Sequence, residues 1–156
     1  MNQPVRTLLV GVGSRGKKWA RILHDEPLAQ TVGYVDLDED NLEWAQLMYE
    51  ARTEVCFKDM SRAIKELAPD LVLLATPPTD RYKEVIGILE NGCHIMSEKP
   101  LSVDFDEGLR MVKAAEEAHL AFAVGLNFRF QNSVLKAREI FQTGEIGSPR
   151  YAGYSY

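Results

Sequence analysis

The sequence predicts an α/β fold built on a doubly wound parallel sheet. Short apolar runs with strand character alternate with segments of helical periodicity from one end of the chain to the other. The strand-like runs are about 20 to 30 residues apart, which is the spacing of βαβ units. The run Leu71–Ala75 is apolar throughout, as expected for a strand buried on both faces. Because βαβ crossovers are right-handed, these observations predict a single doubly wound domain.

Each expected element has its own signal. The expected strands, all short apolar runs, are Val5–Val10, Thr31–Asp36, Glu54–Phe57, Leu71–Ala75, Cys93–Ser97 and Ala121–Gly125. The expected helices, all with apolar residues at three- and four-residue spacing, are Ser14–Asp25, Asp38–Ala51, Met60–Leu67, Thr79–Glu90, Ser102–His119 and Asn132–Gln142. Pro27, Pro69 and the pair Asn91-Gly92 end three of these helices. A turn at Gly144 and Gly147 then leads into a β-prone end, Arg150–Tyr156.

The spacing also predicts which helical side chains face the sheet. The expected inward residues, helix by helix, are Trp19, Ile22 and Leu23; Leu42 and Ala45 with Met48 or Tyr49; Ala63, Ile64 and Leu67; and Phe105, Leu109, Val112 and Ala115.

Composition and charge exclude several classes of protein. The chain has 156 residues, of which 46% are hydrophobic and 26% charged, as in ordinary globular proteins. A net charge of −5 argues against a nucleic-acid-binding surface. The longest apolar run, Ala121–Leu126, is too short to span a membrane, and Met1–Pro4 lacks a secretory signal. Cys56 and Cys93 are read as reduced, so a cytoplasmic protein is expected.

Residues 11–16 read Gly-Val-Gly-Ser-Arg-Gly, directly after the first strand and at the start of the first helix. This context is the one that a dinucleotide-binding G-x-G-x-x-G loop requires in a Rossmann fold. Gly11 makes the tight turn, Gly13 lets a pyrophosphate approach the backbone, and Gly16 lets the helix pack against the strand. The free N–H groups of the helix N-terminus would hold the anion. The alternative is a plain strand-to-helix turn.

Asp36 lies 20 residues after Gly16, at the end of the second strand. A carboxylate there accepts hydrogen bonds from the adenosine ribose hydroxyls and repels a 2′-phosphate, which favours NAD. Arg15 favours NADP instead, because its guanidinium could pair with that phosphate. NAD is therefore the expected cofactor and NADP the alternative; an acid that only caps a helix is the other reading of Asp36.

Two further segments end the fourth and fifth strands at the same edge of the sheet. Thr76-Pro77-Pro78 fixes the backbone where a flat ring could lie, although it also suits a simple helix start. Glu98-Lys99-Pro100 places a lysine where proton transfer would be useful, although a lysine at a strand end is more often a surface residue. His24, His94 and His119 lack the spacing of metal ligands, so no metal site is expected.

Taken together, these segments resemble the glucose–fructose oxidoreductase / inositol dehydrogenase family (Gfo/Idh/MocA), in its N-terminal dinucleotide-binding domain. The resemblance covers essentially the whole chain. Besides the glycine loop it rests on Tyr34-Val35-Asp36, Ala75-Thr76-Pro77-Pro78, Asn91-Gly92-Cys93-His94-Ile95-Met96-Ser97-Glu98-Lys99-Pro100 and Gly125-Leu126-Asn127-Phe128-Arg129-Phe130.

The resemblance implies a set of site residues. Thr76 and Pro77 line the nicotinamide side. Lys99 is the implied catalytic residue, between the nicotinamide and the substrate hydroxyl, after which a cis bond to Pro100 is expected. Lys99 and Arg129 are implied to contact substrate. The implied cofactor-binding residues are Gly11, Gly13, Ser14, Arg15, Gly16, Asp36, Thr76, Pro77, Glu98 and Asn127.

This chain departs from the family pattern in two ways. The family usually has His five residues after the Thr of its Thr-Pro motif, where this chain has Arg81. Family members also continue into a second α/β domain, with an Asp and a His for substrate, and this sequence ends near its expected first strand. We therefore expect residues 1–126 to form the Rossmann domain and 127–156 a connecting helix and the start of that absent C-terminal substrate domain.

The expected function is that of an NAD(P)-dependent oxidoreductase. Its implied reaction is hydride transfer between the nicotinamide and a secondary alcohol of a sugar or cyclitol, with the chain alone inactive until a second domain completes it. The alternative is a free-standing dinucleotide-binding module, acting as a redox sensor or partner subunit. The expected partner is a small-molecule polyol or sugar, and neither nucleic acid nor a membrane is expected to bind. The chain is also expected to self-associate into a homo-oligomer through residues 128–156.

Overall fold

The computed structural model describes residues 3–148, 150, 151 and 153. The chain divides into two compact units, Met1–Gly125 and Leu126–Tyr156, and each is described by itself. Among the described residues, no helix is both long and apolar enough to cross a lipid bilayer.

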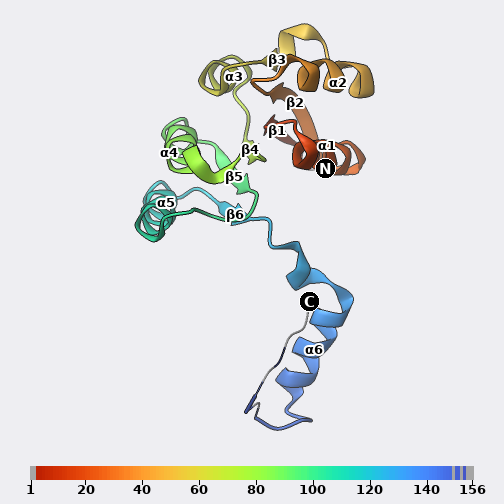
Figure 1. Ribbon diagram of the computed structural model, residues 1–156, viewed down its shortest axis with the longest axis vertical. Helices are drawn as coiled ribbons and strands as arrows, with labels where there is room; N and C mark the ends of the chain where they lie inside the picture. Colours follow the sequence, from red (N-terminus) through yellow and green to blue (C-terminus); the bar gives the residue numbers. More distant parts are fainter. Residues whose placement is uncertain (1–2, 149, 152, 154–156) are drawn as a thin grey trace. The chain divides into compact units, whose positions relative to one another are not determined.

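The first unit is built on a six-stranded parallel sheet with the order β3-β2-β1-β4-β5-β6 (Figure 1). The chain leaves the sheet centre toward β3, returns, and then continues toward β6, so the order reverses between β1 and β4. This is the doubly wound arrangement that the sequence predicts, and the fold class is confirmed. The strands are β1 Val5–Val10, β2 Ala29–Val35, β3 Cys56–Phe57, β4 Leu71–Leu74, β5 His94–Ser97 and β6 Phe122–Val124.

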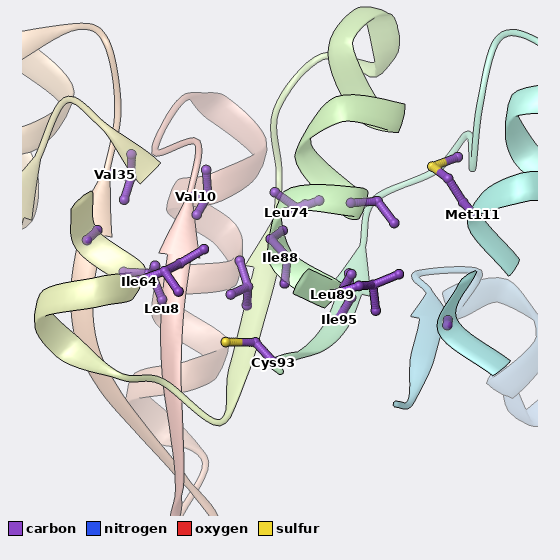
Figure 2. Close-up of a cluster of buried hydrophobic side chains, with 14 of the residues drawn as sticks. Leu8, Val10, Val35, Ile64, Leu74, Ile88, Leu89, Cys93, Ile95 and Met111 are labelled. Atoms are coloured by element: carbon purple, nitrogen blue, oxygen red, sulfur yellow. The ribbon is translucent and has the colours of Figure 1, made fainter. Parts of the chain in front are cut away.

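Helices cover both faces of this sheet. On one face, side chains from three helices pack with β1, β4 and β5 (Figure 2). On the other face, two helices pack against a second buried cluster. Alternate residues of β1 point to opposite faces of the sheet, so Leu8 and Val10 pack in the first buried cluster and Leu9 packs in the second. The helices are α1 Ser14–Asp25 and α2 Glu39–Tyr49 on the second face, and α3 Met60–Leu67, α4 Arg81–Glu90 and α5 Phe105–Glu117 on the first.

Element boundaries differ from the expected ones where short 3-10 turns intervene. Turn η1 (Thr53–Val55) takes up the start of the third expected strand, and turn η2 (Pro78–Asp80) delays the start of α4 to Arg81. Helix α5 begins after Asp104, whose carboxylate accepts a hydrogen bond from the Glu107 N–H at 2.8 Å. Asp104 therefore caps this helix, which begins at Phe105 rather than at Ser102 as expected.

Of the four residues of α5 expected to face the core, only Ala115 is buried. Phe105, Leu109 and Val112 are 83%, 44% and 37% exposed, whereas Met111 is fully buried. The buried stripe consists of Gly108, Met111 and Ala115. A Cβ on Gly108 would make only an ordinary contact, at 3.5 Å, with the Cβ of Ser102. The face that α5 buries is thus rotated from its most apolar one.

On α1, the expectation that Ile22 faces the core is wrong, because this side chain is 53% exposed. On α2, of the two alternatives, Tyr49 packs against the second core cluster and Met48 is 59% exposed. Smaller residues form the stripe that α1 buries, so the large apolar side chains are not the best guide to it. That stripe consists of Gly16, Ala20 and Leu23.

The second unit consists of turn η3 (Asn127–Phe130) and helix α6 (Asn132–Thr143), which ends at Gly144 in the left-handed conformation, with φ of 75°. None of its described residues is buried. The strand expected over Arg150–Tyr156 falls largely outside the described residues. The large apolar side chains that this unit exposes are Leu126, Phe128, Phe130, Val134, Leu135, Phe141, Ile146 and Tyr151.

Candidate cofactor-binding site

Most of the expected site residues follow the carboxyl ends of four neighbouring strands. Because all the strands are parallel, their carboxyl ends meet at one edge of the sheet. The reversal between β1 and β4 makes this edge the place where doubly wound folds bind ligands. The segments that meet there are Gly11–Gly16 after β1, Asp36 after β2, Thr76–Pro77 after β4 and Glu98–Lys99 after β5.

Two positions in the loop after β1 accept only glycine. Gly11 has φ of +86°, and a Cβ on it would lie 2.9 Å from the backbone of Ala75 and of Thr76. A Cβ on Gly16 would overlap the carbonyl oxygen of Gly11. Glycine at 11 therefore allows the turn beside β4, and glycine at 16 allows α1 to start close to the turn.

Gly13 differs from both, because a Cβ there would meet none of the described atoms within 4 Å. Gly13 is the N-cap of α1, and within the described chain no side chain caps this helix and no acid lies in its first turn. By contrast, Asp38, Asp59 and Asp104 cap α2, α3 and α5 through hydrogen bonds of 3.1, 2.6 and 2.8 Å. The start of α1 thus combines open space with free backbone N–H groups, as an anion site needs.

Asp36 is fixed beside this loop. Its Oδ2 accepts a hydrogen bond from the Val12 N–H at 2.6 Å, and its Oδ1 accepts one from the Asp38 N–H at 2.9 Å. Each carboxylate oxygen keeps a further lone pair for a ligand hydroxyl. The side chain is partly exposed, and the next residue, Leu37, is 84% exposed.

Glu98 joins the glycine loop to the end of β5. Its Oε1 accepts hydrogen bonds from Arg15 Nε at 2.6 Å and from Trp19 Nε1 at 2.7 Å. Burial raises the pKa of Glu98, but the hydrogen bonds from Arg15 and Trp19 and the Arg15 charge outweigh it, so this pKa lies below its usual value. The Arg15 guanidinium is therefore engaged at the β5 side of the edge.

Lys99 follows Glu98 directly and is exposed. Its peptide bond to Pro100 is cis, which confirms the expectation from the family resemblance. Pro77 is exposed as well, whereas Thr76 is partly buried and its Oγ1 donates a hydrogen bond to Glu84 Oε2 at 2.7 Å.

Sequence reasoning missed the part that Arg81 plays at this edge. The side chain is 1% exposed. Its Nη2 donates to the Thr76 carbonyl at 2.6 Å, and its Nη1 donates to the Glu98 carbonyl at 2.8 Å and to Ser97 Oγ. Burial lowers the pKa of Arg81, and the nearby Glu84 and Glu98 carboxylates partly offset this effect. The only sequence signal was that Arg81 stands where the resembling family usually has histidine.

The remaining expectations fall elsewhere. Asn127 and Arg129 lie on η3 in the second unit, and their roles stay predictions. A cavity of about 400 Å³ lies at edge strand β3 and contains none of the expected site residues. Its lining includes Thr53, Glu54, Lys58 and Arg62. Within the described part of the chain, no group of three or more histidines, cysteines or acids is arranged to hold a metal ion.

Comparisons with known proteins agree with this geometry. Inositol 2-dehydrogenase of Rhodococcus erythropolis is 31% identical over 158 residues, covering 95% of this chain and 43% of that protein. The 2,7-anhydro-N-acetylneuraminate hydratase of Escherichia coli is 30% identical over 142 residues, covering 89% of this chain and 36% of that protein. The crystal structure of the WlbA dehydrogenase from Bordetella pertussis, in complex with NADH and UDP-GlcNAcA, matches with a TM-score of 0.87 and 26% identity, over 94% of this chain and 42% of that one.

The chain thus spans less than half the length of these proteins. A family model, described as the oxidoreductase family with an NAD-binding Rossmann fold (GFO_IDH_MocA), matches residues 5–126. That match includes the whole sheet and the edge at which the glycine loop, Asp36 and Lys99 meet. The chain therefore belongs to this oxidoreductase family and carries its NAD-binding Rossmann domain.

Proposed function

We propose that this protein transfers hydride between a nicotinamide cofactor and a secondary alcohol of a sugar or cyclitol, and that residues 1–126 form its cofactor-binding domain. The start of α1 is the observation that carries this proposal. Gly13 leaves open space beside free N–H groups, and Asp36 is fixed next to them. Residues 127–156 would then connect to a substrate domain.

The residues at the sheet edge suit the successive parts of NAD. Backbone N–H groups of Gly13, Ser14 and Arg15 would hold the pyrophosphate, while Gly11 and Gly16 shape the loop. The Asp36 carboxylate would accept the ribose hydroxyls. At the other side of the loop, Thr76, Pro77 and Glu98 would border the nicotinamide; Asn127 is proposed to join them.

NAD is proposed as the preferred cofactor over NADP. A 2′-phosphate would bring negative charge against the Asp36 carboxylate, which is repulsive. Arg15, the one loop side chain that would attract such a phosphate, is hydrogen-bonded to Glu98 instead. Both observations favour the cofactor without the phosphate.

Bound NAD would supply the hydride acceptor, and a side chain of the protein would have to take up the proton of the substrate hydroxyl. Lys99 projects from the end of β5 and is exposed, so its Nζ is available to polarise a substrate hydroxyl or to exchange its proton. Arg129 is proposed to contact the same substrate. Two relatives are named inositol 2-dehydrogenase and 2,7-anhydro-N-acetylneuraminate hydratase, which supports a cyclitol or sugar substrate.

Three further proposals concern the protein's location, its self-association and the activity of residues 1–156 alone. The described cysteines, Cys56 and Cys93, are free thiols, which supports a reducing, cytoplasmic location. The exposed apolar side chains of the second unit support self-association. Residues 1–156 alone are expected to bind NADH but not to reduce NAD+ with polyols, since relatives use a chain more than twice as long.

Titration of the protein with NADH and with NADPH, followed by cofactor fluorescence, tests this function. NADH is expected to bind at least about tenfold more tightly, because like charges brought together cost several kcal/mol. Asp36→Ser should remove most of this preference, and Asp40→Ser, at an exposed position on α2, should leave it unchanged. Tighter binding of NADPH by the wild type would contradict the preference, and no binding of either cofactor would contradict the function.

A further inference from the structure

We propose that Arg81 and Glu84, both in the first turn of α4, are positioning residues that hold the two strand ends bordering the nicotinamide. This inference rests on the proposed function. It assigns a role to two side chains that are neither in the glycine loop nor among the residues expected to touch cofactor.

Arg81 bridges two backbone segments that the sheet itself does not join. The β4–β5 ladder ends with Leu74 opposite Ser97, and its last backbone hydrogen bond runs from the Glu98 N–H to the Leu74 carbonyl at 2.8 Å. Beyond this point the Arg81 guanidinium connects the two segments, since it donates hydrogen bonds to the carbonyls of Thr76 and Glu98 at 2.6 and 2.8 Å. A buried guanidinium costs free energy unless its donors are satisfied, so these bonds hold the three groups together.

Glu84 completes the arrangement from the same helix turn. Its Oε2 accepts the hydrogen bond from Thr76 Oγ1 at 2.7 Å and lies 3.6 Å from Arg81 Nε. That Nε is the single buried side-chain nitrogen or oxygen without a hydrogen-bond partner among the described residues, so the Glu84 charge is its nearest compensation. Thr76 is thus held at its hydroxyl by Glu84 and at its carbonyl by Arg81.

The consequence concerns one half of the cofactor. Pro77 and Lys99 directly follow the two carbonyls that Arg81 holds, so their positions depend on this bridge. The loop that would hold the adenosine and pyrophosphate has contacts that do not involve the bridge, from the Val12 N–H to Asp36 and from the Gly11 N–H to the Val35 carbonyl at 2.8 Å. Loss of the bridge should therefore loosen the nicotinamide side and spare the adenosine side.

Calorimetric titration with NADH and with ADP-ribose, which lacks the nicotinamide, separates the two halves. Arg81→Met and Glu84→Met should each weaken NADH binding by about fivefold or more, as expected when a hydrogen bond to a charged group is lost. ADP-ribose binding should change less than about twofold, within the scatter of substitutions that do not touch a ligand. Arg62→Met and Glu66→Met are matched controls, because that ion pair on α3 is exposed by 70% and 48% and should affect neither ligand.

A merely structural role would weaken both ligands alike. Equal losses of NADH and ADP-ribose affinity, or no loss of NADH affinity, would therefore overturn the inference. If thermal melting shows that Arg81→Met does not fold, Glu84→Met decides by the same criterion, since Glu84 is partly exposed. Failure of the wild type to bind NADH would overturn the proposed function as well, whereas wild-type binding with unselective variants would overturn the inference alone.

Discussion

Gly13 and Gly16 lie three residues apart in the same loop, and the structure predicts opposite effects for the same substitution. In Gly13→Ala the new Cβ enters open space, and φ of −67° suits any residue. The fold should tolerate this change, while NADH affinity should fall by roughly tenfold because the methyl group occupies the path of the pyrophosphate. In Gly16→Ala the Cβ meets the Gly11 carbonyl oxygen. The free energy of unfolding should therefore drop by about 1–3 kcal/mol.

Urea unfolding and NADH titration of both variants check this pair. The expected result is a stable Gly13→Ala protein that binds weakly and a destabilised Gly16→Ala protein. Normal NADH affinity in Gly13→Ala would show that the open space beside the loop is not the pyrophosphate path.

Glu98 gives a prediction about pH. Hydrogen bonds from Arg15 and Trp19 hold the folded-state pKa of Glu98 below the usual value, although burial acts in the opposite direction. A carboxyl with a lowered folded-state pKa stabilises the protein above its unfolded pKa of about 4.3 and loses that contribution as the pH falls through the folded-state value. The difference in unfolding free energy between wild type and Glu98→Gln should thus be constant from neutral pH down to about 5 and shrink below it.

Urea unfolding of the two proteins at a series of pH values measures this difference. Trp19 reports the transition in both, since its indole contacts the substituted side chain. A difference that stays constant or grows in acid would show that the carboxylate form of Glu98 is not what these donors stabilise.

At the scale of elements, α5 shows how a helix face is chosen. Met111 is fully buried and packs into the core drawn in Figure 2, whereas Phe105 is 83% exposed. Met111→Ala should lower the free energy of unfolding by about 2–5 kcal/mol, the usual cost of a cavity in a core. Phe105→Ala should change it by less than about 0.5 kcal/mol. Urea unfolding of both variants tests the orientation, and a larger loss for Phe105→Ala would reverse it.

The sequence was sufficient for most elements and for the glycine loop. Apolar runs such as Leu71–Ala75 indicated the strands, and the crossover rule indicated a doubly wound sheet, because local hydrophobicity and chirality do not depend on the rest of the chain. The face of α5 could not be predicted in this way. Two stripes at three- and four-residue spacing compete on it, and the buried one includes the small residues Gly108 and Ala115, which counting large apolar residues does not detect.

The position of Arg81 shows the same limit within the site. An arginine at the start of a helix is normally a surface residue. Its burial depends on acceptors at Thr76, Ser97 and Glu98, the last two lying 16 and 17 residues away, at the end of β5 and directly after it. Only the tertiary structure brings these groups together, so the sequence could mark the position as unusual without showing what the side chain does.

At the scale of the whole chain, the second unit has no core of its own. Its described residues are all partly or fully exposed, and they include Phe128, Phe130 and Phe141. Exposed apolar groups of this extent usually mark an interaction surface. We predict self-association of the full chain through residues 128–156, which sedimentation detects by comparison with a chain ending at Leu126. The shorter chain keeps every buried residue of the described structure, so it should fold as a monomer. Two monomeric proteins at tens of micromolar would contradict self-association.

The central claim is that NAD binds at the edge of the sheet where β1, β2, β4 and β5 end (Figure 1). The most direct measurement is the change in backbone amide NMR shifts when the ¹⁵N-labelled protein is titrated with NADH. The largest changes are predicted for Gly13, Arg15, Leu37 and Lys99, which border the proposed pyrophosphate, adenosine and nicotinamide positions. Changes concentrated instead around Thr53, Lys58 and Arg62, at the cavity beside β3, would place the cofactor elsewhere and contradict the account.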